Sequence, residues 1–226
     1  MKDRNQLIIS IYAVWAFLVF AITFVLKGPD SDNVTHILII LLFLAQLAAY
    51  PVLSKLAKRH GPKASFIAFG LVFAACVEGF YMISAPVFGS LRVTAQTSLG
   101  SIITHYLADL FFTLPAYAVI FAMIWFFINK YEYDFWEYFI LITLGQTLGD
   151  GGAFFFMASP LMLAFLPYVM VNYHSMNVIP YLLVRDGLKP TTKSRWKYIV
   201  PPASIILAYL VLGSLIKVAG SYLALA

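Results

Sequence analysis

The chain has 226 residues, of which 62% are hydrophobic and only 11% are charged. A soluble domain carries about 25% charged residues, so this composition excludes an ordinary soluble fold and indicates that lipid solvates most of the surface. The net charge of +5 does not indicate a nucleic-acid partner, because the basic residues lie in short loops between apolar segments, where they act as topology signals. We therefore expect one all-α membrane domain over residues 1–226.

Seven apolar segments follow one another along the chain, each long enough to cross roughly 30 Å of hydrocarbon at about 1.5 Å per residue. They cover residues 7–27, 35–57, 64–86, 103–129, 135–158, 160–185 and 198–224. Turn-forming residues such as Gly61-Pro62 separate most of them, whereas Ser159-Pro160 is a weak break between the fifth and sixth. The sequence predicts a polytopic bundle of seven transmembrane helices.

The basic residues outside these segments lie almost entirely on one side of such a bundle. That side holds Lys2, Arg4, Lys55, Lys58, Arg59, Lys63, Lys130, Arg185, Lys189, Lys193, Arg195 and Lys197. The other side holds only Lys27 and Arg92. Because loops rich in Lys and Arg stay in the cytoplasm, we expect a cytoplasmic N-terminus. Merging the fifth and sixth segments would move the cluster at 185–197 across the membrane and remove the asymmetry.

Ionisable side chains inside the spans are the candidate functional groups, since each costs at least ~2.5 kcal/mol to insert. Glu78, Asp109, Asp150 and Lys217 lie on four different spans. All four are roughly 9–12 Å from the non-cytoplasmic end at the helical rise of about 1.5 Å per residue. Such groups must face the bundle interior, where they can pair or line a cavity. Other polar side chains in the spans are His105, Gln146, Asn172, His174 and Asn177.

Glu78 and Asp109 are the expected catalytic residues. A low dielectric and a neighbouring carboxylate both disfavour the ionised form of a carboxyl group, so such a pair can hold one proton between them. Such a pair can act as a general acid and a general base. Other interpretations stay open: the two acids can hold helices together, Asp150 can pair with Lys217, and Lys217 can instead snorkel outward.

Four short motifs on successive predicted helices resemble those of one membrane family. They are Val77-Glu78-Gly79-Phe80-Tyr81, Asp109-Leu110-Phe111-Phe112-Thr113-Leu114-Pro115, Gly145-Gln146-Thr147-Leu148-Gly149-Asp150 and Ile179-Pro180-Tyr181-Leu182-Leu183-Val184. In this order they resemble the EXPERA superfamily, which includes the emopamil-binding sterol Δ8–Δ7 isomerases and the sigma-2 receptor. The resemblance covers residues 64–186 as a four-helix core, with additional flanking helices at 7–57 and 198–224.

The resemblance implies a sterol-sized cavity and, in a eukaryotic cell, an endoplasmic reticulum membrane. In the isomerase branch one acid protonates an alkene and a second group removes a different proton from the carbocation, and Glu78 and Asp109 match the positions of the family's acids. We expect neither a metal nor a cofactor. The expected substrate-binding residues are Tyr81, Phe112, Thr113, Gln146, Asp150, Asn172, Tyr173, His174 and Asn177.

The leading functional hypothesis is an isomerase or cyclase that acts on a sterol or terpenoid lipid. A membrane terpene cyclase of a meroterpenoid pathway is an alternative that stays open. Ala74 stands where the sterol isomerases have a histidine, which argues against the isomerase activity itself. Aromatic faces that stabilise cations in a dry cavity would suit either reaction. A non-catalytic sterol- or amine-binding protein like the sigma-2 receptor is the second hypothesis. A retinal protein using Lys217 and a transporter are further alternatives. The expected partners are a hydrophobic small molecule and the bilayer, and a homodimer is left open.

Overall fold

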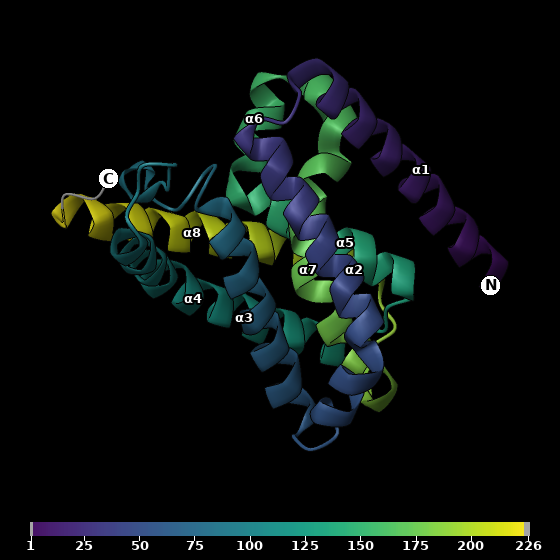
Figure 1. Cartoon of the computed structure of the whole chain (residues 1–226). Coiled ribbons are helices and arrows are strands. Elements are labelled where there is room, and N and C mark those ends of the chain that lie inside the picture. The colour runs from purple at the N-terminus through teal and green to yellow at the C-terminus, as the bar shows by residue number, and fades with distance from the viewer. Residues whose placement is uncertain (1, 224–226) are drawn as a thin grey trace.

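The computed structural model describes residues 2–223, which are helical with no strand over that range (Figure 1). The principal helices are α1 (Lys2–Lys27), α2 (Ser31–Ala57), α3 (Pro62–Tyr81), α4 (Leu99–Lys130), α5 (Phe135–Thr147), α6 (Ala153–Ala158), α7 (Leu166–Val184) and α8 (Val200–Tyr222). A π turn (Leu148–Gly152) joins α5 to α6, and a 3₁₀ segment (Pro160–Phe165) leads into α7. The all-helical prediction is confirmed.

Six described segments are long and apolar enough to cross a membrane, which is compatible with an integral membrane protein. They are Gln6–Lys27, Ser31–Ala57, Pro62–Tyr81, Leu99–Lys130, Phe135–Ala158 and Arg195–Tyr222. The sixth predicted span, 160–185, is helical but is not among them. The physical reason is its composition, because Asn172, His174 and Asn177 lie in the middle of α7.

Helix α7 is the central helix of the bundle. Every residue from Met170 to Tyr181 is buried, and α7 contacts α1, α2, α3 and α5. The outer helices show the opposite pattern: on α1, Phe17 is 71% exposed and Val25 is 83% exposed. Apolar exposure on this scale is unusual for a soluble monomer, so the distribution fits a lipid-facing outer layer around one polar helix.

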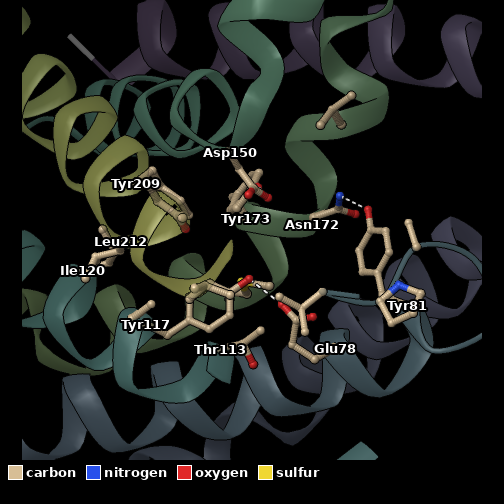
Figure 2. A pocket seen from close by; sticks show the side chains of 18 of the residues that line it. Glu78, Tyr81, Thr113, Tyr117, Ile120, Asp150, Asn172, Tyr173, Tyr209 and Leu212 are labelled. Atoms are coloured by element: carbon tan, nitrogen blue, oxygen red, sulfur yellow. Dashed lines mark hydrogen bonds between the residues drawn. The ribbon is translucent and has the colours of Figure 1, made fainter. Parts of the chain in front are cut away.

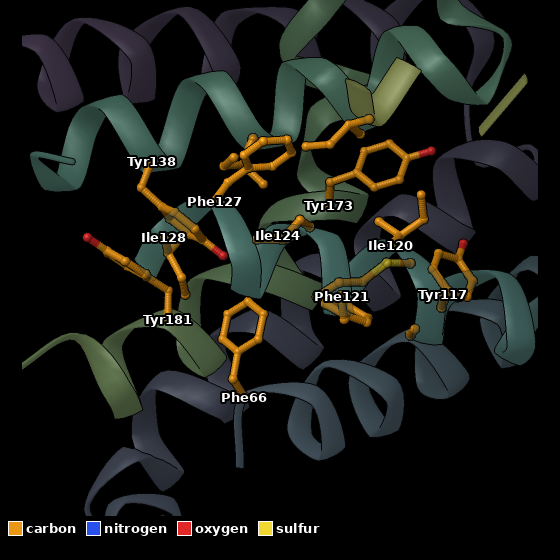
Figure 3. Packing of buried hydrophobic residues seen from close by; sticks show 14 of the residues in the cluster. Phe66, Tyr117, Ile120, Phe121, Ile124, Phe127, Ile128, Tyr138, Tyr173 and Tyr181 are labelled. Atoms are coloured by element: carbon orange, nitrogen blue, oxygen red, sulfur yellow. The ribbon is translucent and has the colours of Figure 1, made fainter. Parts of the chain in front are cut away.

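The apolar core lies where α4 packs against α3, α5 and α7 (Figure 3). Phe66 of α3 meets Phe121 of α4 edge to face, with ring centroids 6.1 Å apart. Tyr138 of α5 stacks on Tyr181 of α7 at 3.7 Å. The first contact joins α3 to α4, and the second joins α5 to the central helix α7.

Helix α7 runs parallel to α2 along most of its length. Near the beginning of both helices, the Tyr168 hydroxyl donates to Oδ1 of Asn33 at 2.7 Å. Near their ends, the Tyr50 hydroxyl donates to the Leu182 carbonyl at 3.3 Å. The loop after α7 therefore lies at the same end of the bundle as the α2–α3 turn. The Thr192 amide also donates to the Lys130 carbonyl at 2.9 Å, which brings the α4–α5 loop to this end.

The predicted continuous helix over 135–158 is wrong in one respect, since the chain leaves helical geometry at Asp150 and Gly151. Asp150 has φ −81° and ψ 38°, and Gly151 has φ +91°, a conformation that favours glycine. A Cβ at Gly152 would lie 2.3 Å from the Thr147 carbonyl oxygen. The glycines at 151 and 152 thus permit the break.

Gly149 has a different role, because it lets the π turn (Leu148–Gly152) and α8 approach closely. A Cβ built there would lie 2.8 Å from Cβ of Tyr209 and 3.0 Å from Cα of Ile206. Neither atom is the flexible end of a side chain, so a larger residue would push the two segments apart.

We predict that Gly149→Ala destabilises the fold by about 1–3 kcal/mol, the usual cost of overpacking. The matched control is Gly100→Ala, which also lies in a helix but where a Cβ would meet nothing within 4 Å. Thermal unfolding in detergent measures both. A melting temperature for Gly149→Ala equal to that of Gly100→Ala would contradict the close contact between the π turn and α8.

Candidate functional site

A cavity of about 420 Å³ lies between α3, α4, α7 and α8. The loop that follows α3 closes part of it. The lining residues are Glu78, Tyr81, Ala85, Pro86, Val87, Thr113, Ala116, Tyr117, Ile120, Asp150, Val169, Asn172, Tyr173, Met176, Tyr209, Leu212, Gly213, Ile216 and Lys217. Most of this wall is apolar or aromatic, and the polar groups are concentrated in a few side chains.

Glu78 forms one acidic part of the wall. Its side chain projects from α3 and is only 8% exposed. The Tyr117 hydroxyl, from α4, donates to Oε1 of Glu78 at 2.5 Å (Figure 2). A short hydrogen bond to a carboxyl group fixes the rotamer of that group, so Tyr117 aims Glu78 at the cavity.

Asp150 forms a second acidic part of the wall, on another side of the cavity (Figure 2). The helix break places it there, because its backbone leaves the α5 path at this residue. The Tyr173 hydroxyl, from α7, donates to Oδ2 of Asp150 at 2.5 Å. The cavity therefore contains two carboxyl groups, each held by one tyrosine.

Amide side chains lie at the edge of the cavity and behind its wall. Asn172 donates to the Tyr81 hydroxyl, so that α7 and α3 are joined at the cavity edge (Figure 2). Behind the wall, Nε2 of Gln146 donates to the Tyr209 hydroxyl at 3.2 Å, and Nδ2 of Asn177 donates to Oε1 of Gln146 at 2.5 Å. Gln146 and Asn177 do not line the cavity and instead support Tyr209, which does.

Lys217 is the only basic residue that lines this cavity. It is an exposed residue of α8, and it makes no ion pair with any acid in the described part of the chain. The Asp150–Lys217 pair, one of the interpretations that the sequence left open, is thus not formed among the described residues. Neither Glu78 nor Asp150 has a countercharge from the described residues.

Asp109 lies beside the cavity and not on its wall. It is fully buried, and its Oδ1 accepts the backbone N–H of Val87 at 2.8 Å. Its Oδ2 is buried without a hydrogen-bond partner among the described residues, and the electrostatic influence of Asp109 on Glu78 indicates that the two carboxyl groups are near each other. Asp109 therefore holds the loop that closes the cavity and is not among the lining residues, and its catalytic role beside Glu78 stays a prediction.

Four of the nine predicted substrate-binding residues do not line the cavity, namely Gln146 and Asn177 behind its wall and His174 and Phe112 farther away. His174 faces α1, where Nε2 is 2.8 Å from the Tyr12 hydroxyl and the ring stacks on Phe139 at 3.8 Å. Phe112 packs edge to face on Phe88 at 5.0 Å. Of the remaining predicted residues, those that line the cavity are Tyr81, Thr113, Asp150, Asn172 and Tyr173.

Sequence reasoning did not single out Tyr117 or Tyr209 as site residues. Tyr117 follows Asp109 by eight residues, and Tyr209 precedes Lys217 by eight residues. Residues about two helical turns apart lie on one face, but Asp109 does not line the cavity, so only the spacing of Tyr209 from Lys217 was an available signal. The sequence could not show which of the many aromatic residues at such spacings face a cavity.

No protein-family model, no curated protein and no solved structure matches this chain.

The position of His174 generates a prediction about stability. Tyr12→Phe removes the hydroxyl that satisfies a buried ring nitrogen, which costs about 1–3 kcal/mol. Tyr222→Phe is the control, because Tyr222 is 86% exposed. Thermal unfolding should separate the two variants by several degrees, and an unchanged midpoint for Tyr12→Phe would show that the Tyr12–His174 contact does not hold α1 to α7.

Proposed function

We propose that this chain is an integral membrane acid–base isomerase or cyclase acting on a sterol or terpenoid lipid. The observation that carries the proposal is the pair of tyrosine-held carboxyl groups, Glu78 and Asp150, on the wall of one largely apolar cavity. Small-molecule pockets have volumes of about 300–1,000 Å³, and about 420 Å³ is available here. The four motifs that resemble the EXPERA superfamily support the same substrate class.

Glu78 is the proposed general acid. Its carboxyl group interacts with that of Asp109, and no described cation pairs with either. Two adjacent carboxylates without a countercharge are too costly in an apolar interior, so the pair shares one proton. Asp109 then acts as a positioning residue, in place of the catalytic role that we expected from the sequence, and Glu78 delivers the proton to the substrate.

Asp150 is the proposed general base. In the first step the π electrons of a substrate alkene form a C–H bond with the proton of Glu78, which leaves a carbocation. In the second step Asp150 takes a proton from a neighbouring carbon, and the released C–H electron pair forms the new double bond. Proton return from Asp150 to Glu78 completes the cycle without any net oxidation or reduction.

The cavity wall suits a cationic intermediate. Tyr81, Tyr117, Tyr173 and Tyr209 all line it, and aromatic faces attract cations through their quadrupole. Apolar residues such as Ile120 and Leu212 keep the same space poor in water, which protects a carbocation from hydration.

A second candidate function is the binding of an amphiphilic amine without chemical conversion. The supporting observation is that neither Glu78 nor Asp150 forms an ion pair with a cation among the described residues, and a ligand ammonium group could supply this charge. Saturable binding of amines together with no product from any sterol or terpenoid would favour this candidate.

We predict that Glu78→Gln and Asp150→Asn each lower turnover by about 100-fold or more, the usual contribution of a general acid or base. Asp109→Asn keeps the acceptor for the Val87 amide and should retain activity within roughly tenfold. Product analysis after feeding membranes with sterol and epoxy-terpenoid substrates measures all three. Loss of activity in Asp109→Asn with full activity in Asp150→Asn would instead restore Asp109 as the second catalytic acid.

We also propose that the chain crosses the membrane seven times with its N-terminus in the cytoplasm. Helix α7 runs parallel to α2 along most of its length, so the two should span the same thickness. The loops that gather at the ends of α2 and α7 carry most of the basic residues, including Lys58, Lys130 and Arg195. Positive charge of this kind marks the cytoplasmic side of a membrane. In a eukaryotic cell, the proposed membrane is that of the endoplasmic reticulum.

Cysteine labelling tests this topology, because Cys76 is the sole cysteine of the chain. In a Cys76→Ser background, Lys58→Cys and Arg195→Cys should react with a membrane-impermeant maleimide only from the cytoplasmic side. Arg92→Cys should react only from the other side. Labelling of Arg195→Cys together with Arg92→Cys would mean that α7 does not cross and that six spans are correct.

A further inference from the structure

A second cavity, of about 580 Å³, lies at the basic end of the bundle, far along α4 from the first. Its wall comes from the beginning of α3, the last turns of α4 and the loop that follows α7. The lining residues are Lys63, Ala122, Trp125, Phe126, Asn129, Lys130, Thr191 and Thr192. We call this space the α3–α4 groove, and it shares no lining residue with the proposed catalytic cavity.

The groove is positively charged and has no acidic lining residue. Lys63 and Lys130 make no ion pair with any described acid, whereas the nearby Glu132 and Glu137 already pair with Lys193 at 3.1 Å and Lys197 at 2.6 Å. Both lysines are exposed, and although Nζ of Lys130 lies 5.5 Å from the ring centroid of Phe126 and 5.4 Å from that of Tyr131, neither lysine has an anionic partner among the described residues. The side chains of Asn129 and Thr192, which line the groove beside the lysines, can donate hydrogen bonds to phosphate oxygens.

The loop wall of the groove is held in place before any ligand arrives. The Thr192 amide donates to the Lys130 carbonyl at 2.9 Å, and the Glu132 amide donates to the Thr192 carbonyl at 3.3 Å. A preformed wall lowers the ordering cost of binding.

The remaining wall is apolar and continues toward the bilayer centre. Ala122 and Phe126 precede Lys130 along α4, and Ala122 lies about 12 Å deeper at the helical rise. Phe126 is 56% exposed. Val119, which lies one turn before Ala122 on the same face of α4, is 50% exposed. Such a face can receive an acyl chain, while Trp125 lies where interfacial aromatic residues anchor to headgroups.

We propose that the α3–α4 groove binds the phosphate headgroup of an anionic glycerophospholipid of the cytoplasmic leaflet, with one acyl chain along α4. Lys63 and Lys130 contact the phosphate, and Ala122 and Phe126 contact the chain. Basic pockets between transmembrane helices on this side of a membrane are suited to such headgroups. The proposal depends on the proposed orientation and not on the proposed enzymatic activity.

The test uses the purified full chain in detergent and native mass spectrometry during titration with phosphatidylglycerol or phosphatidylcholine. We expect tighter binding of the anionic lipid. Lys63→Gln combined with Lys130→Gln should weaken it about 25-fold, at about fivefold for each basic residue. The matched control combines Lys55→Gln with Lys58→Gln, two exposed lysines at the same end but outside the groove, and should change binding by less than about twofold.

Two further measurements separate the sources of the phosphate group. Inorganic phosphate should displace the lipid poorly, and Phe126→Ala should weaken lipid binding, because the acyl chain supplies part of the affinity. Displacement by phosphate as effective as by a short-chain phosphatidylglycerol would overturn the lipid assignment in favour of a free anion. Equal losses in the groove and control pairs, or no preference over phosphatidylcholine, would overturn the site itself.

Discussion

Burial of the polar helix α7 is the constraint on which the rest of this structure depends. A polar group left unsatisfied in hydrocarbon costs several kcal/mol, and lipid tails offer no hydrophobic force to press helices together. The same contacts join helices and satisfy part of this demand, since Nδ1 of His174, Oδ1 of Asn172 and Oδ1 of Asn177 stay without a partner among the described residues. His174 is paired with Tyr12 of α1, Asn172 with Tyr81 of α3, and Asn177 with Gln146 of α5. One helix thus joins three others to itself through hydrogen bonds.

The cavity follows from the same arrangement. Tyr173 of α7 reaches Asp150 only because the backbone leaves the helical path at the Gly151 position. Breaks in a transmembrane helix are tolerated where protein or a cavity surrounds them, and π turns are frequent at functional sites. The break costs local helical hydrogen bonds, and it places a carboxyl group in a chamber whose other walls are largely apolar.

The two ends of the bundle differ in charge and in construction. At the basic end, the Lys197–Glu137 pair and the backbone contacts of Thr192 fix the loop after α7 against the α4–α5 loop. At the opposite end, Asp109 holds Val87 and thereby the loop over the cavity. A lipid-derived substrate and a structural lipid would accordingly meet the protein at different depths, each through a separate set of side chains.

Helix positions could be predicted from the sequence, because apolar run length and turn residues such as Gly61-Pro62 are local signals. The presence of acids within the apolar segments was also determined by the sequence, since Glu78 and Asp150 lie within apolar runs. Which acid faces the cavity was decided by tertiary structure. A helix that is apolar on nearly every side carries little periodic signal for its rotation about its own axis. The contacts of Asp109 with Val87 and of Tyr117 with Glu78 therefore depend on how α3 and α4 pack, which the sequence does not show.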